Sequence, residues 1–166
     1  MVLVPSFIKV LSPPSFLISQ DSIYICGGND GNNILNSFEA YNIQKEKWQT
    51  LESLNWKRDE LAIAMGPDYK IYAIGGFGGP KNSCLQAAER YDIATNKWEQ
   101  IADLNIPRRA LSAVALPDGI YAIGGFDGQN YLSSIEKYDE VKNEWTFISS
   151  MNYARCTLSA IATPDC

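Results

Sequence analysis

The stretch Ile120–Tyr121–Ala122–Ile123–Gly124–Gly125 occurs three times in this chain, with small changes. The two earlier copies are Ile71–Tyr72–Ala73–Ile74–Gly75–Gly76 and Ile23–Tyr24–Ile25–Cys26–Gly27–Gly28. A short apolar run of this kind is typical of a buried β-strand, and glycine at its end permits a positive φ and the close approach of a second backbone. The first glycines of the three pairs lie 48 and 49 residues apart, so the sequence predicts a repeat protein.

Other residues keep a fixed order within each repeat. A Glu lies two residues before a Tyr, the Tyr lies seven residues before a Trp, and an Arg then marks the start of the next unit. These residues are Glu39, Tyr41, Trp48 and Arg58; Glu89, Tyr91, Trp98 and Arg108; and Glu136, Tyr138, Trp145 and Arg155. The spacing changes only in segments rich in Gly, Asn and Pro, which we expect to be loops.

Each unit contains four short segments with the character of strands. The first is small and apolar, the second is the repeated run, the third alternates between polar and apolar residues, and the fourth begins at the Trp. The first segments are 61–65, 111–116 and 158–163; the third are 37–41, 87–91 and 134–138; the fourth are 48–51, 98–101 and 145–148. Four strands in about 50 residues, without a helical pattern, predict an all-β fold of four-stranded antiparallel β-propeller blades. In such blades we expect Tyr91 and Trp98 to pack between neighbours and not to stack on a ligand.

The segment Gly124–Asp139, followed by Trp145, resembles a kelch repeat of the kelch-like (BTB–kelch) subclass. The resemblance covers about residues 20–166. The first unit departs from the pattern at Cys26, where a small residue is usual, and at Asn42, where the other units have Asp. This resemblance implies a module that presents loops to a partner protein, as in the substrate-recognition part of a cullin-RING ubiquitin ligase adaptor. An actin-binding or other cytoskeletal scaffold fits the repeat equally well.

We place full blades at about 15–53, 58–103 and 108–149, with partial strands at 2–11 and 157–163, in one arc over 1–166. Propellers of the kelch family typically close with six blades, so three blades leave an open edge. Three arrangements follow. In the first, which we prefer, the arc is part of a larger propeller that it helps to complete. In the second, two arcs close a ring as a homodimer, and in the third the chain forms a compact four-bladed ring.

One face of the predicted propeller is the expected binding surface. Because successive antiparallel strands reverse direction, the loops after the second and fourth strands emerge on the same side, and recognition concentrates in such loops. Arginine and aromatic side chains, which are enriched in binding hot spots, occur in these loops. The residues that we predict to contact a partner are Phe77, Lys81, Arg109, Phe126, Tyr131 and Tyr153.

The repeated arginines Arg58, Arg108 and Arg155 are predicted to have a structural role, as donors of hydrogen bonds to backbone carbonyls that brace the loops. The cationic side chains on this face favour an acidic or phosphorylated peptide as the ligand. Five nearby acidic residues argue against that preference: Asp30, Asp59, Glu60, Asp103 and Asp127.

Composition excludes several classes of function. The chain has no histidine, which excludes Ser–His–Asp catalysis, His-ligated metals and the copper chemistry of galactose oxidase, a kelch-type enzyme. The Asp-Gly pairs at Asp30 and Asp127 are turn formers before they are catalytic carboxylates. We therefore predict a protein that is not an enzyme and needs no cofactor or metal.

The net charge of −5 gives no reason to expect a nucleic acid or an acidic membrane as the partner. A membrane-spanning helix needs about 20 uninterrupted apolar residues, which the sequence lacks. Pro5, Pro13 and Pro14 interrupt the apolar N-terminal stretch, so we expect no signal peptide. The four cysteines form no CxxC pair and are expected to be reduced thiols, consistent with a cytoplasmic location.

Overall fold

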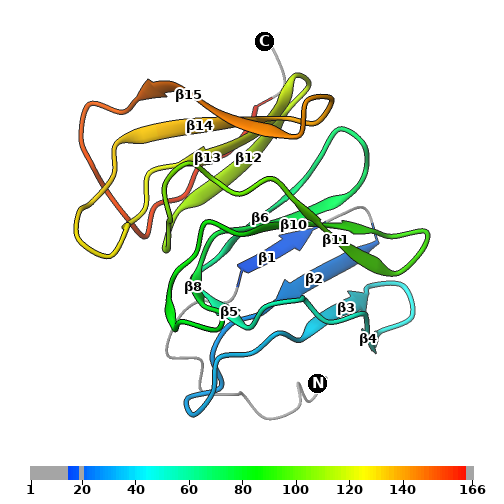
Figure 1. Cartoon of the computed structure of the whole chain (residues 1–166). Helices are drawn as coiled ribbons and strands as arrows, with labels where there is room; N and C mark the ends of the chain where they lie inside the picture. The colour runs from blue at the N-terminus through cyan, green and yellow to red at the C-terminus, as the bar shows by residue number, and fades with distance from the viewer. Residues whose placement is uncertain (1–14, 19–20, 164–166) are drawn as a thin grey trace.

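The structure, a computed structural model, describes residues 15–18 and 21–163, in which every regular element is a β-strand (Figure 1). Three four-stranded sheets follow one another along the chain, and in each sheet consecutive strands pair antiparallel. The first sheet contains β1 (Ser15–Ile18), β2 (Ser22–Cys26), β3 (Phe38–Asn42) and β4 (Lys47–Thr50); the second β6 (Ala62–Met65), β7 (Ile71–Ile74), β10 (Ala88–Asp92) and β11 (Lys97–Ile101); the third β12 (Ser112–Leu116), β13 (Gly119–Ile123), β14 (Ser134–Asp139) and β15 (Glu144–Ser150). The predicted all-β fold with four-stranded blades is confirmed, and we number these sheets blades 1 to 3. The described residues contain no helix of the length and apolarity needed to cross a membrane.

The fixed Tyr–Trp spacing reflects one hairpin that recurs in every blade. Tyr41, Tyr91 and Tyr138 lie directly opposite Trp48, Trp98 and Trp145 on the paired third and fourth strands. The ring centroids of each pair are 5.2 Å apart. Cross-strand aromatic pairs of this kind stabilise the hairpin at the outer edge of each blade.

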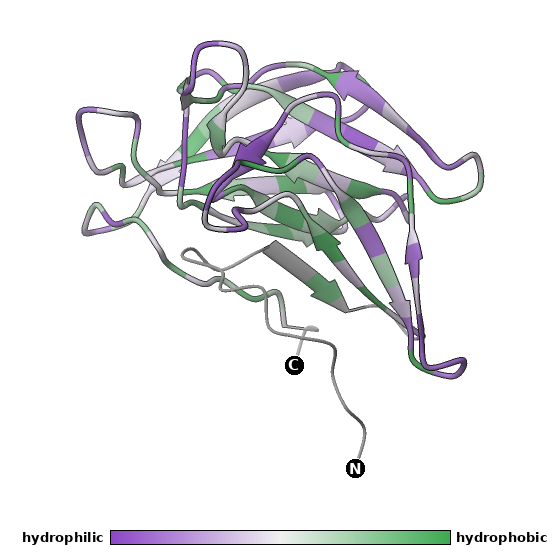
Figure 2. Ribbon diagram, turned by 90° about the horizontal axis from the view of Figure 1, so that it is seen from below, coloured by the Kyte–Doolittle hydropathy of each residue, from purple (hydrophilic) through white to green (hydrophobic). Residues whose placement is uncertain are grey.

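The blades pack face to face, with their first strands β1, β6 and β12 side by side. Phe38 of blade 1 contacts Tyr91 and Trp98 of blade 2 at centroid distances of 4.8 and 5.1 Å. The Trp98 indole N–H also donates a hydrogen bond of 2.8 Å to the carbonyl oxygen of Glu52. Hydrophobic residues accordingly gather within the stacked sheets (Figure 2). The prediction that Tyr91 and Trp98 pack between blades is confirmed.

Each glycine pair anchors the loop that closes its own blade. Gly75 has a φ of +60°, and a Cβ atom there would collide with the carbonyl oxygen of Arg108. The N–H of Gly76 donates a hydrogen bond of 2.7 Å to the same oxygen. The glycines are therefore needed both for their backbone conformation and for the close approach of the Arg108 backbone.

The side chain of Arg108 then reaches into the next blade. It is fully buried and donates hydrogen bonds of 2.9 Å to the carbonyl oxygens of Gly124 and Ser134. Its Nε and Nη2 atoms lie 3.1 and 2.8 Å from Oε1 of Glu136, which is also fully buried. One side chain therefore joins blade 2 to two strand ends and a carboxylate of blade 3.

Arg58 joins blade 1 to blade 2 in the same way. Its guanidinium donates to the carbonyl oxygens of Gly75 and Ala87 and to the carboxylate of Glu89. Burial lowers the pKa of Arg58, and the adjacent Glu89 carboxylate opposes this shift. We call each of these two sets, an Arg of one blade with two carbonyl oxygens and a Glu of the next, an arginine clasp. The predicted structural role of Arg58 and Arg108 is confirmed. The third predicted arginine, Arg155, has an exposed side chain that donates to the carbonyl oxygen of Tyr153 in its own loop at 3.4 Å and, within the described residues, does not form a clasp.

The predicted strand at 157–163 is wrong, because these residues form no strand. The Thr157 N–H donates to the carbonyl oxygen of Ala110 and the Ala160 N–H to Oγ of Ser112, while Ile161 is 85% exposed. A strand needs a partner for its backbone groups, and no second strand of a further blade lies beside this segment in the described structure. The other predicted partial strand, at 2–11, lies outside the described residues.

The arginine clasp makes a prediction about stability. We expect Glu136→Ala to lower the free energy of unfolding by about 3–5 kcal/mol, because it leaves the buried Arg108 guanidinium without its counter-charge. The double variant Arg108→Met/Glu136→Leu removes both charges and should cost less than the sum of the two single variants. Chemical denaturation measures both effects. A loss below about 1 kcal/mol for Glu136→Ala would show that the clasp contributes little.

Candidate functional site

The loop that ends one blade pairs with the loop after the second strand of the next blade. Between blades 1 and 2, β5 (Arg58–Asp59) pairs with β8 (Phe77–Gly78), which in turn pairs with β9 (Ser83–Cys84). Between blades 2 and 3, Arg109 and Phe126 form the equivalent antiparallel bridge. Both sets of loops therefore share one side of the molecule, as expected, and we call this side the loop face. The small three-stranded sheet was not predicted, because its strands are only two residues long.

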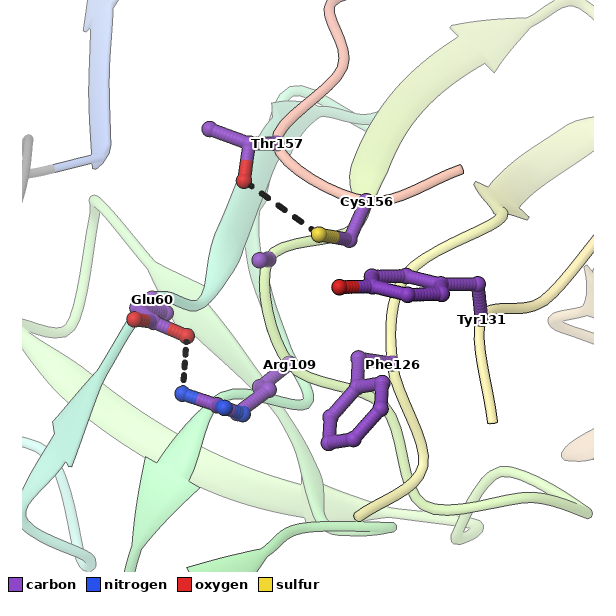
Figure 3. Close-up of a pocket in the computed structure, with 7 residues that line it drawn as sticks. Glu60, Arg109, Phe126, Tyr131, Cys156 and Thr157 are labelled. Atoms are coloured by element: carbon purple, nitrogen blue, oxygen red, sulfur yellow. Dashed lines mark hydrogen bonds and ion pairs between the residues drawn. The ribbon is translucent and has the colours of Figure 1, made fainter. Parts of the chain in front are cut away.

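Arg109 is at the centre of a cluster on the loop face. Its guanidinium carbon lies 5.6 Å from the ring centroid of Phe77 and 5.1 Å from that of Phe126. The Phe126 and Tyr131 rings are 5.3 Å apart. Nη1 of Arg109 donates a hydrogen bond of 3.0 Å to Oε2 of Glu60 (Figure 3). Four loops from two blade junctions thus bring one cation, three aromatic rings and one carboxylate together.

The cluster borders an open pocket of about 200 Å³ (Figure 3). Tyr131 is 62% exposed, so its ring forms an accessible side of the pocket. The pocket is lined by Glu60, Arg109, Ala110, Phe126, Tyr131, Cys156 and Thr157. Cationic, acidic, aromatic and small side chains therefore surround one cavity, and this mixture suits a peptide that presents both a charged and an apolar side chain.

The structure brings together four of the six predicted site residues: Phe77, Arg109, Phe126 and Tyr131. Lys81 lies in the exposed turn between β8 and β9, and Tyr153, which is 73% exposed, lies in the loop before Arg155. Neither residue lines the pocket. The binding role of all six residues remains a prediction.

Sequence reasoning did not assign Cys156 and Thr157 to the site. They occupy the first and second positions after the repeated Arg155, as Arg109 and Ala110 follow Arg108. The repeated arginine has the same backbone contacts in each unit. The two residues that follow it could therefore have been identified from the repeat as residues close to the pocket.

Two of the acidic residues in the loops of this face accept hydrogen bonds within their own turns. Asp127 accepts hydrogen bonds from the backbone N–H groups of Gln129 and Asn130, which lower its pKa. Asp30 does the same with Asn32 and Asn33. Their predicted role as turn formers is confirmed. Among the described residues, no group of three or more His, Cys, Asp or Glu side chains is placed to hold a metal ion.

Arg108 and Arg109 are adjacent, but we expect their replacement to have very different effects on stability. The Arg109 side chain is 36% exposed, and its ion pair with Glu60 is open to solvent. Arg109→Ala should therefore change the free energy of unfolding by only about 1 kcal/mol, whereas Arg108→Ala should cost several times more. Thermal and chemical denaturation of the two variants test this difference. Equal losses would contradict the separation of structural and binding arginines.

The kelch motif profile matches residues 11–55, 66–105 and 107–152, which together make up most of the chain. A search among curated proteins finds no match. Kelch repeats are generally protein-interaction modules and are typically not enzymes. The first and third matched segments contain all four strands of blades 1 and 3, and the second contains β7, β10 and β11 of blade 2. The repeated glycines and arginines explain why these sheets stack as they do. The chain belongs to the kelch-repeat family.

Proposed function

We propose that the loop face binds a segment of a partner protein, with the Arg109 cluster as the anchor. The observation that carries this proposal is the cluster of Arg109, Phe126 and Tyr131 at one open pocket, with Phe77 packed against Arg109 beside it. Arg and Tyr are among the residues that contribute most to protein interfaces. The cluster is also mounted on loops that the arginine clasps hold in place, so little conformational freedom is lost on binding.

The ligand that this site fits is an acidic or phosphorylated peptide. The Arg109 guanidinium carbon lies over the rings of Phe77 and Phe126, and only one of its nitrogen atoms donates to Glu60. The remaining N–H groups suit the oxygens of a carboxylate or phosphate. An apolar neighbour of that group would pack against Tyr131. Glu60 opposes such a ligand, because it competes for Arg109 and repels a second negative charge.

The resemblance of Gly124–Asp139 to the kelch-like subclass supports an extension of this proposal. In that setting the module would recognise substrates in the cytoplasm for a cullin-RING ubiquitin ligase adaptor. The extension predicts that ubiquitylation of the bound partner falls when Arg109 is replaced. An unchanged level of ubiquitylation, with binding lost, would separate partner binding from this role.

The binding proposal is tested with a partner that is captured on the purified chain, identified and then purified itself. We expect Arg109→Ala and Tyr131→Ala each to weaken its binding at least about tenfold, as is usual for hot-spot residues. Matched controls are Lys142→Ala and Tyr69→Ala, which remove an exposed cation and an exposed ring from turns of the opposite face. Titration calorimetry gives the four dissociation constants. Equal losses on both faces would overturn the assignment of the site.

Replacement of Glu60 tests the charge preference of the ligand. We expect Glu60→Gln to strengthen binding of an acidic or phosphorylated peptide by roughly fivefold, because Arg109 loses its internal competitor. The same variant should leave binding of the matched peptide with Gln or unmodified Ser unchanged. Fluorescence anisotropy with the two labelled peptides measures the difference. A weaker acidic complex in Glu60→Gln would mean that Glu60 contacts the ligand as an acceptor.

A further inference from the structure

The same contact pattern recurs at both internal blade junctions. An Asn, and the clasp Arg three residues after it, donate to one Glu of the next blade. The two complete sets are Asn55 and Arg58 with Glu89, and Asn105 and Arg108 with Glu136. The sequence contains a third donor pair, Asn152 and Arg155, and a third acceptor, Glu39. The donors are in blade 3 and the acceptor is in blade 1, at opposite ends of the series.

The backbone of Arg155 is already held in the clasp position. Its N–H donates to the carbonyl oxygen of Leu132 at 3.0 Å, and its carbonyl oxygen accepts from Gly125 at 2.9 Å. These bonds are equivalent to those that hold Arg108. The Arg155 side chain is nevertheless exposed, whereas Arg58 and Arg108 are fully buried. The donor is therefore pre-positioned, and the acceptor blade is not beside it in the described structure.

Blade 1 presents the corresponding acceptor surface. Trp48 is 48% exposed, whereas Trp145, its equivalent in blade 3, is 5% exposed because blade 2 covers it. Tyr41 is half-buried, and within the described residues no hydrogen bond or ion pair engages the Glu39 carboxylate. Glu46 replaces the Asn that accepts a backbone N–H at the other two junctions, and its carboxylate can accept the same bond.

The segment after Arg155 has the sequence of a first strand. Leu158–Thr163 reads L-S-A-I-A-T, and Leu111–Leu116, which contains β12, reads L-S-A-V-A-L. β12 pairs with β13 in a register that sets Ser112 opposite Ile123. The equivalent partner of Ser159 would be Cys26 of β2. In the described structure Ser15 of β1 holds that place opposite Cys26, so Leu158–Thr163 can pair with β2 of a second copy only by displacing its β1.

We propose that two copies of the chain associate head to tail, with the Asn152–Arg155 end of each copy docked on blade 1 of the other. Arg155 and Asn152 then donate to Glu39 of the second copy, and Leu158–Thr163 displaces β1 of that copy and pairs with its β2 in the same register. A head-to-tail interface of this kind closes a ring when its rotation allows. Two arcs of three blades give six, within the four to eight blades of known propellers. The proposal does not depend on the function proposed for the loop face.

The mass in solution is the first test, measured by sedimentation equilibrium over a wide range of concentration. We expect a species of twice the 18.4 kDa of one chain. Arg155→Ala and Glu39→Ala should each weaken the dimer at least about 100-fold, because each leaves a buried charge unpaired. Lys97→Ala, which removes an exposed cation from the middle blade, is the matched control and should leave the dimer intact. A monomer at all concentrations, or open polymers, would overturn the proposal.

A mixture of the Arg155→Ala and Glu39→Ala variants shows whether weaker dimerisation comes from loss of this contact or from misfolding of the variant. One junction of the mixed dimer pairs the intact Arg155 of one variant with the intact Glu39 of the other, and the second junction lacks both charges. The mixture should therefore dimerise more tightly than either variant alone. Absence of this recovery from two folded variants would overturn the pairing of Arg155 with Glu39.

A disulfide reports the geometry of the junction. By the repeat, Cys156 should lie opposite Asn29 of the second copy, as Arg109 lies opposite Phe126. Cross-strand neighbours of this kind have Cα atoms about 5.5 Å apart, within reach of a disulfide. Mild oxidation of Asn29→Cys should give a covalent dimer, and Asn29→Cys/Cys156→Ser and Asn33→Cys should not. Equal cross-linking in all three would contradict the docking.

Truncation tests the role assigned to the C-terminal strand. A chain that ends after Thr157 should dimerise at least tenfold more weakly, because the first strand of the shared blade is lost. Retention of full affinity in the truncated chain would overturn the assignment of Leu158–Thr163 to the position of β1.

Discussion

The stacking of the blades depends on a buried ion pair that crosses from one sheet to the next. The backbone of Arg108 is fixed in its own blade by the glycine pair, while its guanidinium is fully buried against Glu136 and two carbonyl oxygens of the next blade. Removal of either charge leaves the other without compensation in a site that water does not reach. Because the same arrangement occurs at Arg58, the relative position of all three blades rests on two such contacts.

The candidate site is a direct consequence of this constraint. The residue after each repeated arginine has an equivalent place in the loops of the loop face, but its identity varies: it is Asp59, Arg109 or Cys156. At the second junction this residue is Arg109, and loops from two blades supply the phenylalanine rings that contact it. The repeated blades therefore form a regular scaffold, while the residues exposed in their loops differ from blade to blade. Recognition commonly depends on such variable loops on a rigid scaffold.

The sequence was sufficient to predict the elements that repeat. The fixed spacing predicted the strand positions, the Tyr–Trp hairpin and the structural role of Arg58 and Arg108. Prediction was possible because the repeated copies adopt the same local structure. The strand predicted at 157–163 failed because a strand depends on a neighbour that no local pattern encodes. The contact of Arg109 with Phe77 and Phe126 was also beyond prediction, because it joins residues of different blades whose relative position only the packed structure defines.

Native-state hydrogen exchange of Arg108→Ala tests most directly whether the clasp couples neighbouring blades. Repeat proteins are stabilised by contacts between adjacent units, so loss of one contact should weaken the units that share it. We expect lower protection of amides at the end of β13 and in Gly124 and Gly125, with the protection of β2 and β3 in blade 1 largely retained. Unchanged protection in blade 3, or an equal loss in all three blades, would contradict the account.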